Sequence, residues 1–148
     1  MMKKTTLYII SLIAVLLTAS CTRNHGDIGI WFGTWHVESI TASGSIYQNI
    51  VPVNVEGDYF FQFQSKVFRV SQVYGHEQLV ESFGTWDESE DGNKITISFP
   101  DPTVYYIVMP GLEAHNAFTV NTASSGDVTF TKTANDGTTY TYRLKKQP

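Results

Sequence analysis

Apolar and polar residues alternate along most of this chain, and that alternation constrains its fold more than any other feature. The segments YFFQF (59–63), KITISF (94–99) and TTYTYRL (138–144) all repeat with a period of two. This period is typical of a β-strand that buries one face, whereas a helix would place apolar residues every three to four positions. No segment carries a convincing helical stripe, and the best candidate for a helix is a short turn at 27–32. The sequence therefore predicts an all-β fold.

Turn signals separate the alternating runs and indicate how they connect. Asp91-Gly92 and Asp136-Gly137 each stand between two such runs, and Asp-Gly favours a tight hairpin or a short bulged loop. Most connections are short, which favours an up-and-down antiparallel meander, and closing that meander into a barrel leaves no exposed strand edge. We therefore predict an up-and-down antiparallel β-barrel of about eight strands. The candidate segments are 34–41, 58–64, 66–74, 78–87, 94–99, 103–109, 116–122, 127–132 and 138–145.

One connection is longer than the others. Residues 42–57, ASGSIYQNIVPVNVEG, are polar and contain a proline. Loops of more than about 12 residues without structure of their own are uncommon and often functional. We therefore predict a functional loop here, with a lid as one role.

Residues 1–20 have the character of a secretory signal peptide. Lys3 and Lys4 precede an apolar run at 7–19, which is shorter than the roughly 20 residues of a membrane-spanning helix. Cys21 is the only cysteine of the chain and follows this segment directly. A sole cysteine in that place predicts lipidation at Cys21 and attachment to a membrane. An ordinary secretory signal followed by a free thiol, or an uncleaved anchor, remain open.

The expected organisation is a signal peptide at 1–20, a lipidated tether at 21–29 and one barrel domain at 30–148. Without residues 1–20, the chain has 8 basic and 14 acidic side chains, a net charge of −6. No basic stripe remains, which argues against nucleic acid as a partner. A single cysteine excludes an intramolecular disulfide, so the domain must be stabilised by packing.

The residues that usually carry catalysis are scattered. The acidic run at 87–91 lacks the ordered alternation of a calcium-binding loop. The chain has no glycine-rich phosphate loop and no nucleophile elbow. We therefore predict a binding protein rather than an enzyme, with no catalytic residue, metal site or cofactor. The four histidines, none of them paired at metal-ligand spacing, are His25, His36, His76 and His115.

The tetrapeptide FGTW occurs twice, at 32–35 and at 83–86. The first copy opens the first expected strand and resembles the Gly-x-Trp signature of lipocalins. The second, in FGTWDESEDGNKITISF (83–99), is similar to a mid-barrel hairpin of lipocalin-like lipoproteins of Gram-negative bacteria. LTASC (17–21) resembles their lipobox, with Thr18 where leucine is usual. The resemblance covers roughly residues 30–146, and it implies a lipocalin-like barrel with acyl chains such as palmitate on Cys21.

The resemblance also implies a role for three residues and a location. In lipocalins the tryptophan of the signature closes one end of the barrel and stacks on an arginine near the last strand. Carried over, the closing residues are Gly33, Trp35 and Arg143, and guanidinium over indole is worth about 0.5–2 kcal/mol. Thr22 follows the cysteine where retention in the inner membrane would require aspartate. An outer membrane lipoprotein is therefore expected, on either the periplasmic or the surface face.

Large aromatic residues on the expected inward faces are the remaining candidates for function. In a hollow barrel they would line a cavity for a small hydrophobic molecule. In a filled barrel they would form the core, because side chains can occupy the whole interior of eight strands. A filled barrel would instead contact an envelope protein or a glycan through outward aromatics such as Phe60, Tyr105 and Tyr47. The inward set is Tyr59, Phe61, Phe63, Phe68, Tyr74, Phe118, Phe130, Tyr140 and Tyr142.

Overall fold

The computed structural model of the chain describes residues 29–75, 78–100 and 109–148. The chain divides after Phe32 into two units, and the described part of the first contains a single 3-10 turn, η1 (Gly29–Trp31). This turn falls within the helical turn that the sequence predicts. The second unit contains all nine described strands, which are β1 (Gly33–Gly44), β2 (Tyr47–Pro52), β3 (Asp58–Gln64), β4 (Val67–Tyr74), β5 (Gln78–Glu88), β6 (Lys94–Ser98), β7 (His115–Thr122), β8 (Val128–Thr133) and β9 (Thr139–Lys146).

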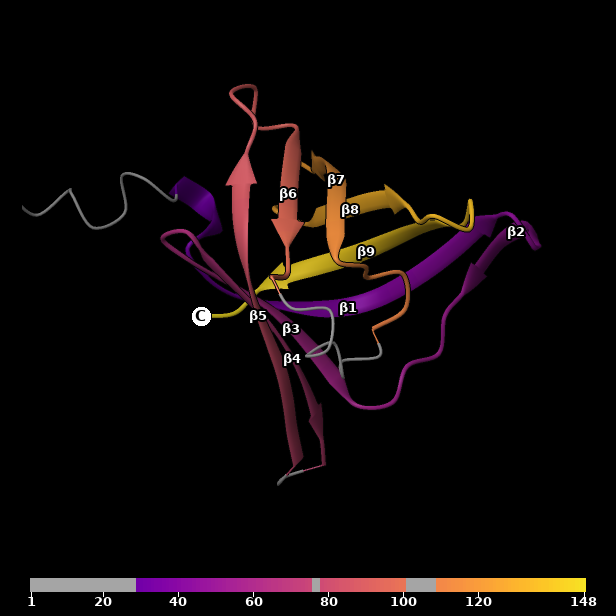
Figure 1. Cartoon of the computed structure of the whole chain (residues 1–148), viewed down its shortest axis with the longest axis horizontal. Helices are drawn as coiled ribbons and strands as arrows, with labels where there is room; N and C mark the ends of the chain where they lie inside the picture. The colour runs from indigo at the N-terminus through magenta and orange to yellow at the C-terminus, as the bar shows by residue number, and fades with distance from the viewer. Residues whose placement is uncertain (1–28, 76–77, 101–108) are drawn as a thin grey trace, which may run out of the picture. The chain divides into compact units, whose positions relative to one another are not determined.

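The second unit is a closed antiparallel barrel (Figure 1). Strands β3 to β9 each pair with the next strand in the chain, and β9 pairs back onto β1 from Trp35–Lys146 to Ser43–Thr139. On its other side, β1 pairs first with β3 and then, near its end, with β2. Eight strands therefore close the wall, and β2 adds a ninth beside the end of β1. This confirms the predicted up-and-down barrel.

The barrel has two ends, a base and a mouth. The base is the end at which β1 begins and at which the β3–β4 turn, 65–66, lies. The mouth is the opposite end, where β3 begins and where the β8–β9 turn, 134–138, lies. No helix among the described residues is long and apolar enough to cross a membrane.

A β-bulge in β1 keeps both halves of this long strand facing the core. Trp35 and Val37 are buried, and the register with β9 then shifts between Val37 and Ser39. After the shift, Ile40 and Ala42 are the buried residues. An extra residue in one strand changes the parity of its side chains. The bulge therefore lets β1 pack its apolar residues inward along its whole length.

The 42–57 segment differs from its prediction. It is not one structureless loop, because residues 47–52 form β2 and return along β1 through a turn at Gly44 and Ser45, which have φ values of 75° and 48°. Short runs such as YQNIVP lack the alternation that identifies a strand, and hairpin pairing with β1 stabilises this one. The predicted strand at 103–109 lies almost entirely outside the described residues, and Met109 itself is not in a strand.

Candidate functional site

The base half of the barrel interior is filled by aromatic side chains. Five of the nine predicted ligand-lining residues lie there, and each is 0% exposed. The rings contact one another, with centroid distances of 5.2 Å for Phe61–Phe68, 5.1 Å for Phe63–Phe68 and 5.3 Å for Phe118–Phe130. Such offset and edge-on contacts are those of a packed aromatic core. The five residues are Phe61, Phe63, Phe68, Phe118 and Phe130.

The four predicted tyrosines share the inward parity, and the Tyr142 ring contacts the packed core, with centroid distances of 6.1 Å to Phe61 and 5.8 Å to Phe118. Tyr59 and Tyr142 are buried, whereas Tyr74 and Tyr140 are half-buried. The Tyr142 hydroxyl donates a hydrogen bond of 2.6 Å to the carbonyl oxygen of Pro110. Burial, followed by the nearby Tyr74 and Glu56, raises the pKa of Tyr59 to about 12. Tyr59 therefore stays neutral at ordinary pH. The four tyrosines offer hydroxyl groups to the mouth half.

Buried polar residues that the sequence did not predict share this inward parity with the tyrosines. Gln72 on β4, Asn116 on β7 and Lys132 on β8 are each less than 5% exposed. The strand alternation carried a signal for all three, and Gln72 shares its parity with the buried Phe68 and Val70. Lys132 shares its parity with the buried Val128 and Phe130, and Asn116 shares its parity with Phe118 and Val120. Their polar character conflicts with that parity, because inward positions of a barrel are usually apolar.

Lys132 is the centre of a hydrogen-bonded cluster at the mouth. Its ammonium group lies 2.8 Å from the Glu113 carboxylate and 2.8 Å from the Asn116 Oδ1 atom. The other Glu113 oxygen accepts a 2.9 Å bond from the Asn135 backbone N–H. Asn116 in turn donates to the Glu113 carbonyl at 2.6 Å. Burial opposes ionisation of Glu113, but the bonds from Lys132 and Asn135 and the Lys132 charge outweigh it, so the pKa of Glu113 lies below its usual value.

Residues 109–114, here called the mouth segment, lie against inward side chains of β8 and β9. Met109 is buried, Pro110 accepts the Tyr142 hydroxyl, and Glu113 reaches Lys132. Gly111 has a φ of 81°, and a Cβ atom there would come within 2.4 Å of the Tyr140 ring. The segment therefore crosses the mouth in close contact with the barrel interior.

Gln72 leaves one polar atom without a partner. Its amide nitrogen donates a 2.8 Å bond to the Glu56 carbonyl, while its Oε1 atom is buried and accepts no hydrogen bond from the described residues. Gln72 shares the inward parity of Phe68 and Val70 on β4. Buried acceptors in folded proteins nearly always have a partner, so an orphan one needs an explanation.

The base is closed by a different cation from the one that the sequence predicts. Trp35 is buried, and the Lys146 ammonium lies 5.5 Å from its ring centroid. Arg143 instead points outward and forms ion pairs with Asp127 at 3.1 Å and Glu38 at 3.5 Å. Its parity on β9 is opposite to that of the buried Leu144 and Tyr142, so it cannot reach an indole ring on the inside. Assigning Arg143 as the partner of Trp35 was wrong.

Gly33 and Gly84, the glycines of the two FGTW copies, have different structural roles. Gly33 has a φ of 114°, a conformation that side chains disfavour. Gly84 has no such φ, but a Cβ atom there would lie 2.5 Å from the Ser98 carbonyl oxygen and 3.0 Å from the Phe99 ring. Trp86, two residues later, packs edge-on against Phe63 at 5.0 Å.

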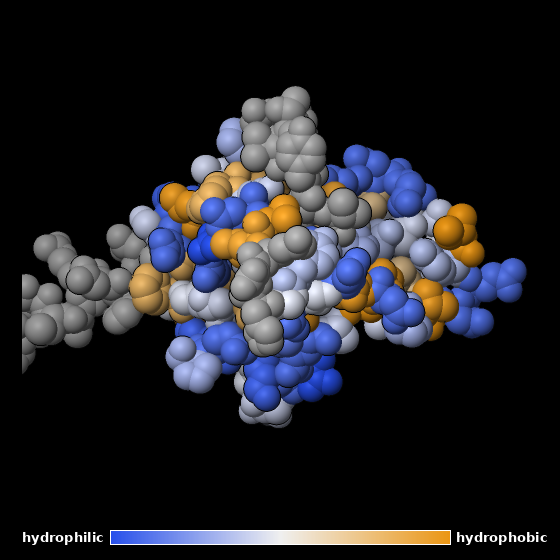
Figure 2. Space-filling view, turned by 90° about the horizontal axis from the view of Figure 1, so that it is seen from below, coloured by the Kyte–Doolittle hydropathy of each residue, from blue (hydrophilic) through white to orange (hydrophobic). Residues whose placement is uncertain are grey.

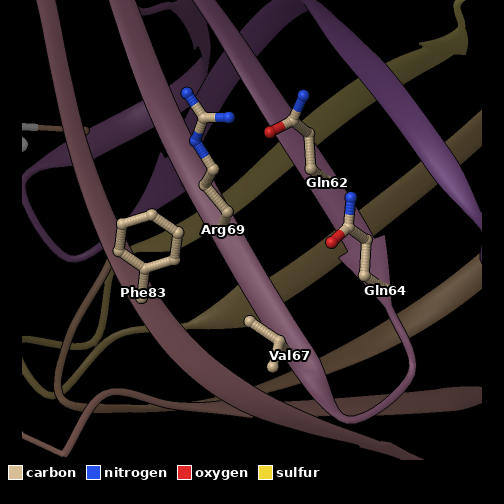
Figure 3. A pocket seen from close by; sticks show the side chains of 5 residues that line it. All are labelled: Gln62, Gln64, Val67, Arg69 and Phe83. Atoms are coloured by element: carbon tan, nitrogen blue, oxygen red, sulfur yellow. The ribbon is translucent and has the colours of Figure 1, made fainter.

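A shallow hollow of about 100 Å³ lies on the outside of the barrel wall (Figure 3). The Arg69 guanidinium is paired with Glu81 at 2.5 Å and lies 5.9 Å from the centroid of the Phe83 ring. Phe83 and Val67 are 52% and 47% exposed. The hollow therefore combines amide groups, a cation and exposed apolar surface. Its five lining residues, from β3, β4 and β5, are Gln62, Gln64, Val67, Arg69 and Phe83.

The outward aromatics of the interaction hypothesis are less exposed than expected. Phe60 is half-buried, with its ring 5.1 Å from that of His36, and Tyr47 is half-buried in β2. Tyr105 and Cys21 lie outside the described residues. Within the described ranges, no three His, Cys, Asp or Glu side chains gather closely enough to hold a metal ion.

Comparison with known proteins relates the chain to others through its fold. No protein-family model matches the sequence, and no curated protein matches it. A lipocalin-like protein from Bacteroides uniformis superposes with a TM-score of 0.53 at 19% identity, covering 80% of this chain and all of the other. An uncharacterized protein from Bacteroides eggerthii superposes with a TM-score of 0.52 at 14% identity, covering 78% of this chain and 99% of the other. At these identities the likeness is one of fold, and the fold is that of a lipocalin-like barrel.

Proposed function

We propose that this lipocalin-like barrel is the binding domain of a lipid-anchored envelope lipoprotein and holds a small, mainly hydrophobic molecule in its mouth half. The observation that carries the proposal is the buried Gln72 Oε1 atom, which has no partner among the described residues. Leaving a buried acceptor unpaired costs about 1–3 kcal/mol. A ligand that donates a hydrogen bond to Gln72 would remove that cost on binding.

The mouth half supports such a ligand better than the base half does. At the base, the rings of Phe61, Phe63 and Phe68 already contact each other. Towards the mouth, Tyr74 and Tyr140 are only half-buried and present both an apolar ring and a hydroxyl. Binding sites for small molecules combine apolar walls with a few polar groups that orient the ligand.

The binding proposal is tested by two measurements. Native mass spectrometry of the full chain, extracted in mild detergent from its own host, is expected to show a retained small molecule. Titration of that retained molecule into ligand-stripped protein is expected to show about tenfold weaker binding in Gln72→Leu, because a polar ligand then loses one hydrogen bond.

Gln64→Leu serves as the control, because Gln64 is an exposed glutamine on the outer face of the neighbouring strand β3. It should bind like the wild type. If no molecule is retained, and if stripped protein also binds no neutral apolar probe such as Nile red, the binding proposal is refuted.

A second candidate function is contact with an envelope protein or a glycan through the outer hollow. The observation that favours it is the exposed Phe83 ring beside Arg69, since aromatic residues and arginine are enriched where proteins meet partners. Phe83→Ala should then abolish binding to cell-envelope extract or to immobilised glycans, with Thr85→Ala, exposed on the same strand, as the control. Equal binding by the two variants would exclude this hollow as the contact site.

A further inference from the structure

We infer that the molecule bound in the mouth half carries an anionic head group, such as the carboxylate of a fatty acid, which pairs with Lys132 in place of Glu113. This inference rests on the proposed binding function and names the chemical class of its ligand. It begins from the position of Lys132, which follows the buried Val128 and Phe130 on the inward parity of β8. A lysine side chain rarely occupies such a position, because removing its charge from water is costly without a partner.

The partner of Lys132 does not belong to the barrel wall. Glu113 comes from the mouth segment, which meets β8 across the opening. The two side chains differ in exposure, since Lys132 is 2% exposed and Glu113 is 27% exposed. Glu113 can therefore turn towards water, giving up its bonds to Lys132 and Asn135, whereas Lys132 remains enclosed. An exchange of anions at Lys132 needs a cation that stays buried and an anion that can leave. Lys132 and Glu113 differ in this way.

The ammonium group also has one N–H donor for which the described residues supply no acceptor. An ammonium group has three N–H donors, and the described residues supply two acceptors, Glu113 Oε2 and Asn116 Oδ1. Asn116 is fixed from both sides, because its amide nitrogen donates to the Glu113 and Ile97 carbonyls. An incoming carboxylate can thus pair with Lys132 and leave Asn116 in place. The Glu113 carboxylate shows where such a group would sit.

Charge balance selects an anion over a neutral ligand. If a neutral molecule displaced Glu113, Lys132 would keep an uncompensated charge in the barrel. An anionic head group restores the pair, while the Tyr140 and Tyr142 rings, stacked at 6.4 Å on the neighbouring strand, offer an apolar surface to the rest of the molecule. Burial, then Tyr140 and Glu113, raises the pKa of Tyr142, so this tyrosine adds no competing negative charge at neutral pH.

The test compares two ligands that differ only in the head group. Dodecanoate and 1-dodecanol are titrated into the full chain at neutral pH, each below the concentration at which it aggregates, and binding is followed by displacement of the neutral dye Nile red. Dodecanoate is expected to bind about tenfold more tightly or better, the size of one buried charge-assisted hydrogen bond. In Lys132→Met, the two ligands should bind equally.

Glu113→Gln distinguishes an exchange of anions at Lys132 from an ion pair that is purely structural. Removing the competing carboxylate should strengthen dodecanoate binding several-fold and leave dodecanol binding nearly unchanged. Lys145→Met is the matched control, because Lys145 is exposed on β9. If the wild type binds both ligands equally, or if Lys132→Met keeps the preference for dodecanoate, the anionic ligand is refuted while the binding function stands. If neither ligand nor Nile red binds, the binding function is refuted as well.

Discussion

At the scale of single residues, the glycines of the two identical FGTW segments are required for different physical reasons. Gly33 supplies a φ of 114° at the start of β1, whereas Gly84 makes space for the Ser98 carbonyl. Glycine satisfies either demand, since it has no Cβ atom. The sequence could show that FGTW is repeated, but it could not show which demand each copy meets. That difference depends on contacts with β6, which only the folded barrel brings together.

Gly84→Ala is therefore expected to destabilise the barrel through a steric clash. The new Cβ atom would lie 2.5 Å from the Ser98 carbonyl oxygen, so β5 and β6 must move apart. Overpacking of this kind costs about 1–3 kcal/mol. Urea unfolding followed by tryptophan fluorescence measures the loss, and Thr85→Ala, at the exposed next position, should change stability by much less. Equal stabilities of the two variants would show that the strands are not held this closely.

The raised pKa of Tyr59 predicts that the folded chain loses stability at high pH. Its pKa is raised from 10.0 to about 12 in the folded chain, first by burial and then by Tyr74 and Glu56. Folding therefore disfavours the tyrosinate. The stabilising effect of a neutral Tyr59 is complete below pH 10 and is lost as the pH rises towards 12.

Urea midpoints measured from pH 9 to pH 12 should fall less steeply for Tyr59→Phe, which cannot ionise, than for the wild type. Tyr47→Phe is the control, because Tyr47 lies on β2, which pairs only with β1 and does not belong to the closed wall. Parallel curves for Tyr59→Phe and the wild type would contradict the assignment.

At the scale of elements, the sequence predicted the strands that alternate and missed those that do not. β3, β6 and β9 have a clear period of two, and their predicted bounds differ from the structure by at most one residue at either end. β2 was missed because it pairs with a single strand and is mostly exposed, so burial imposes no pattern on it. Ile46, just before β2, and Ile50, within it, are 82% and 74% exposed. Hydrophobic residues also appear in orange at the right of Figure 2, the side on which β2 lies in Figure 1.

The candidate site could be predicted only in part for a related reason. The alternation placed all nine aromatic residues on the inward parity, but it could not say which rings fill the base and which face the mouth. Lys132 and Asn116 were missed because their polarity conflicts with their parity. A polar residue is tolerated there only through Glu113, which the chain brings from a connection whose course no local pattern specifies.

The mouth segment is expected to loosen when Glu113 is protonated. The pKa of Glu113 is lowered in the folded chain, so the stabilising effect of the ion pair is present above the usual carboxyl range and is lost as the pH falls through the lowered value. Asp136 lies nearby and opposes the ionisation of Glu113, while Tyr140 and Tyr142 stay neutral in acid. Hydrogen exchange of residues 111–114 should therefore be slow at neutral pH and several-fold faster, relative to the chemical rate, in acid.

Glu113→Gln distinguishes this explanation from general acid unfolding. The variant should exchange faster in residues 111–114 at neutral pH and show little further change in acid. The β3–β4 hairpin at the base serves as an internal control, since it lies far along the barrel from Lys132. If the variant keeps the same acid dependence as the wild type, Glu113 is not the titrating group.

At the scale of the whole molecule, barrel closure depends on β1, which pairs with β9 over most of its length and with β2 and β3 on its other side. The resemblance of the FGTW segments to lipocalin signatures predicted this fold, and the short connections predicted its topology. The base closure was predicted less well, because Lys146 rather than Arg143 lies over Trp35. One step along β9 moves a side chain to the other face of the wall, so a shift of a few residues decides which cation can close the base.

The proposed anchor predicts that Cys21 determines where the molecule resides but not how stable its barrel is. The barrel unit, 33–148, contains no cysteine, so no bond within it depends on Cys21. Two or three acyl chains bury many methylene groups at about 0.8 kcal/mol each, which is sufficient for firm attachment to a membrane.

In a Gram-negative host fed labelled palmitate, the wild type should carry label and sediment with membranes. Cys21→Ser should lose the label and leave the membrane fraction, yet its barrel should unfold at the same urea concentration. Ser20→Ala, which keeps a small residue before the cysteine, should behave like the wild type. Label that persists in Cys21→Ser, or a wild type with a free Cys21 thiol, would leave the barrel intact and remove the anchor.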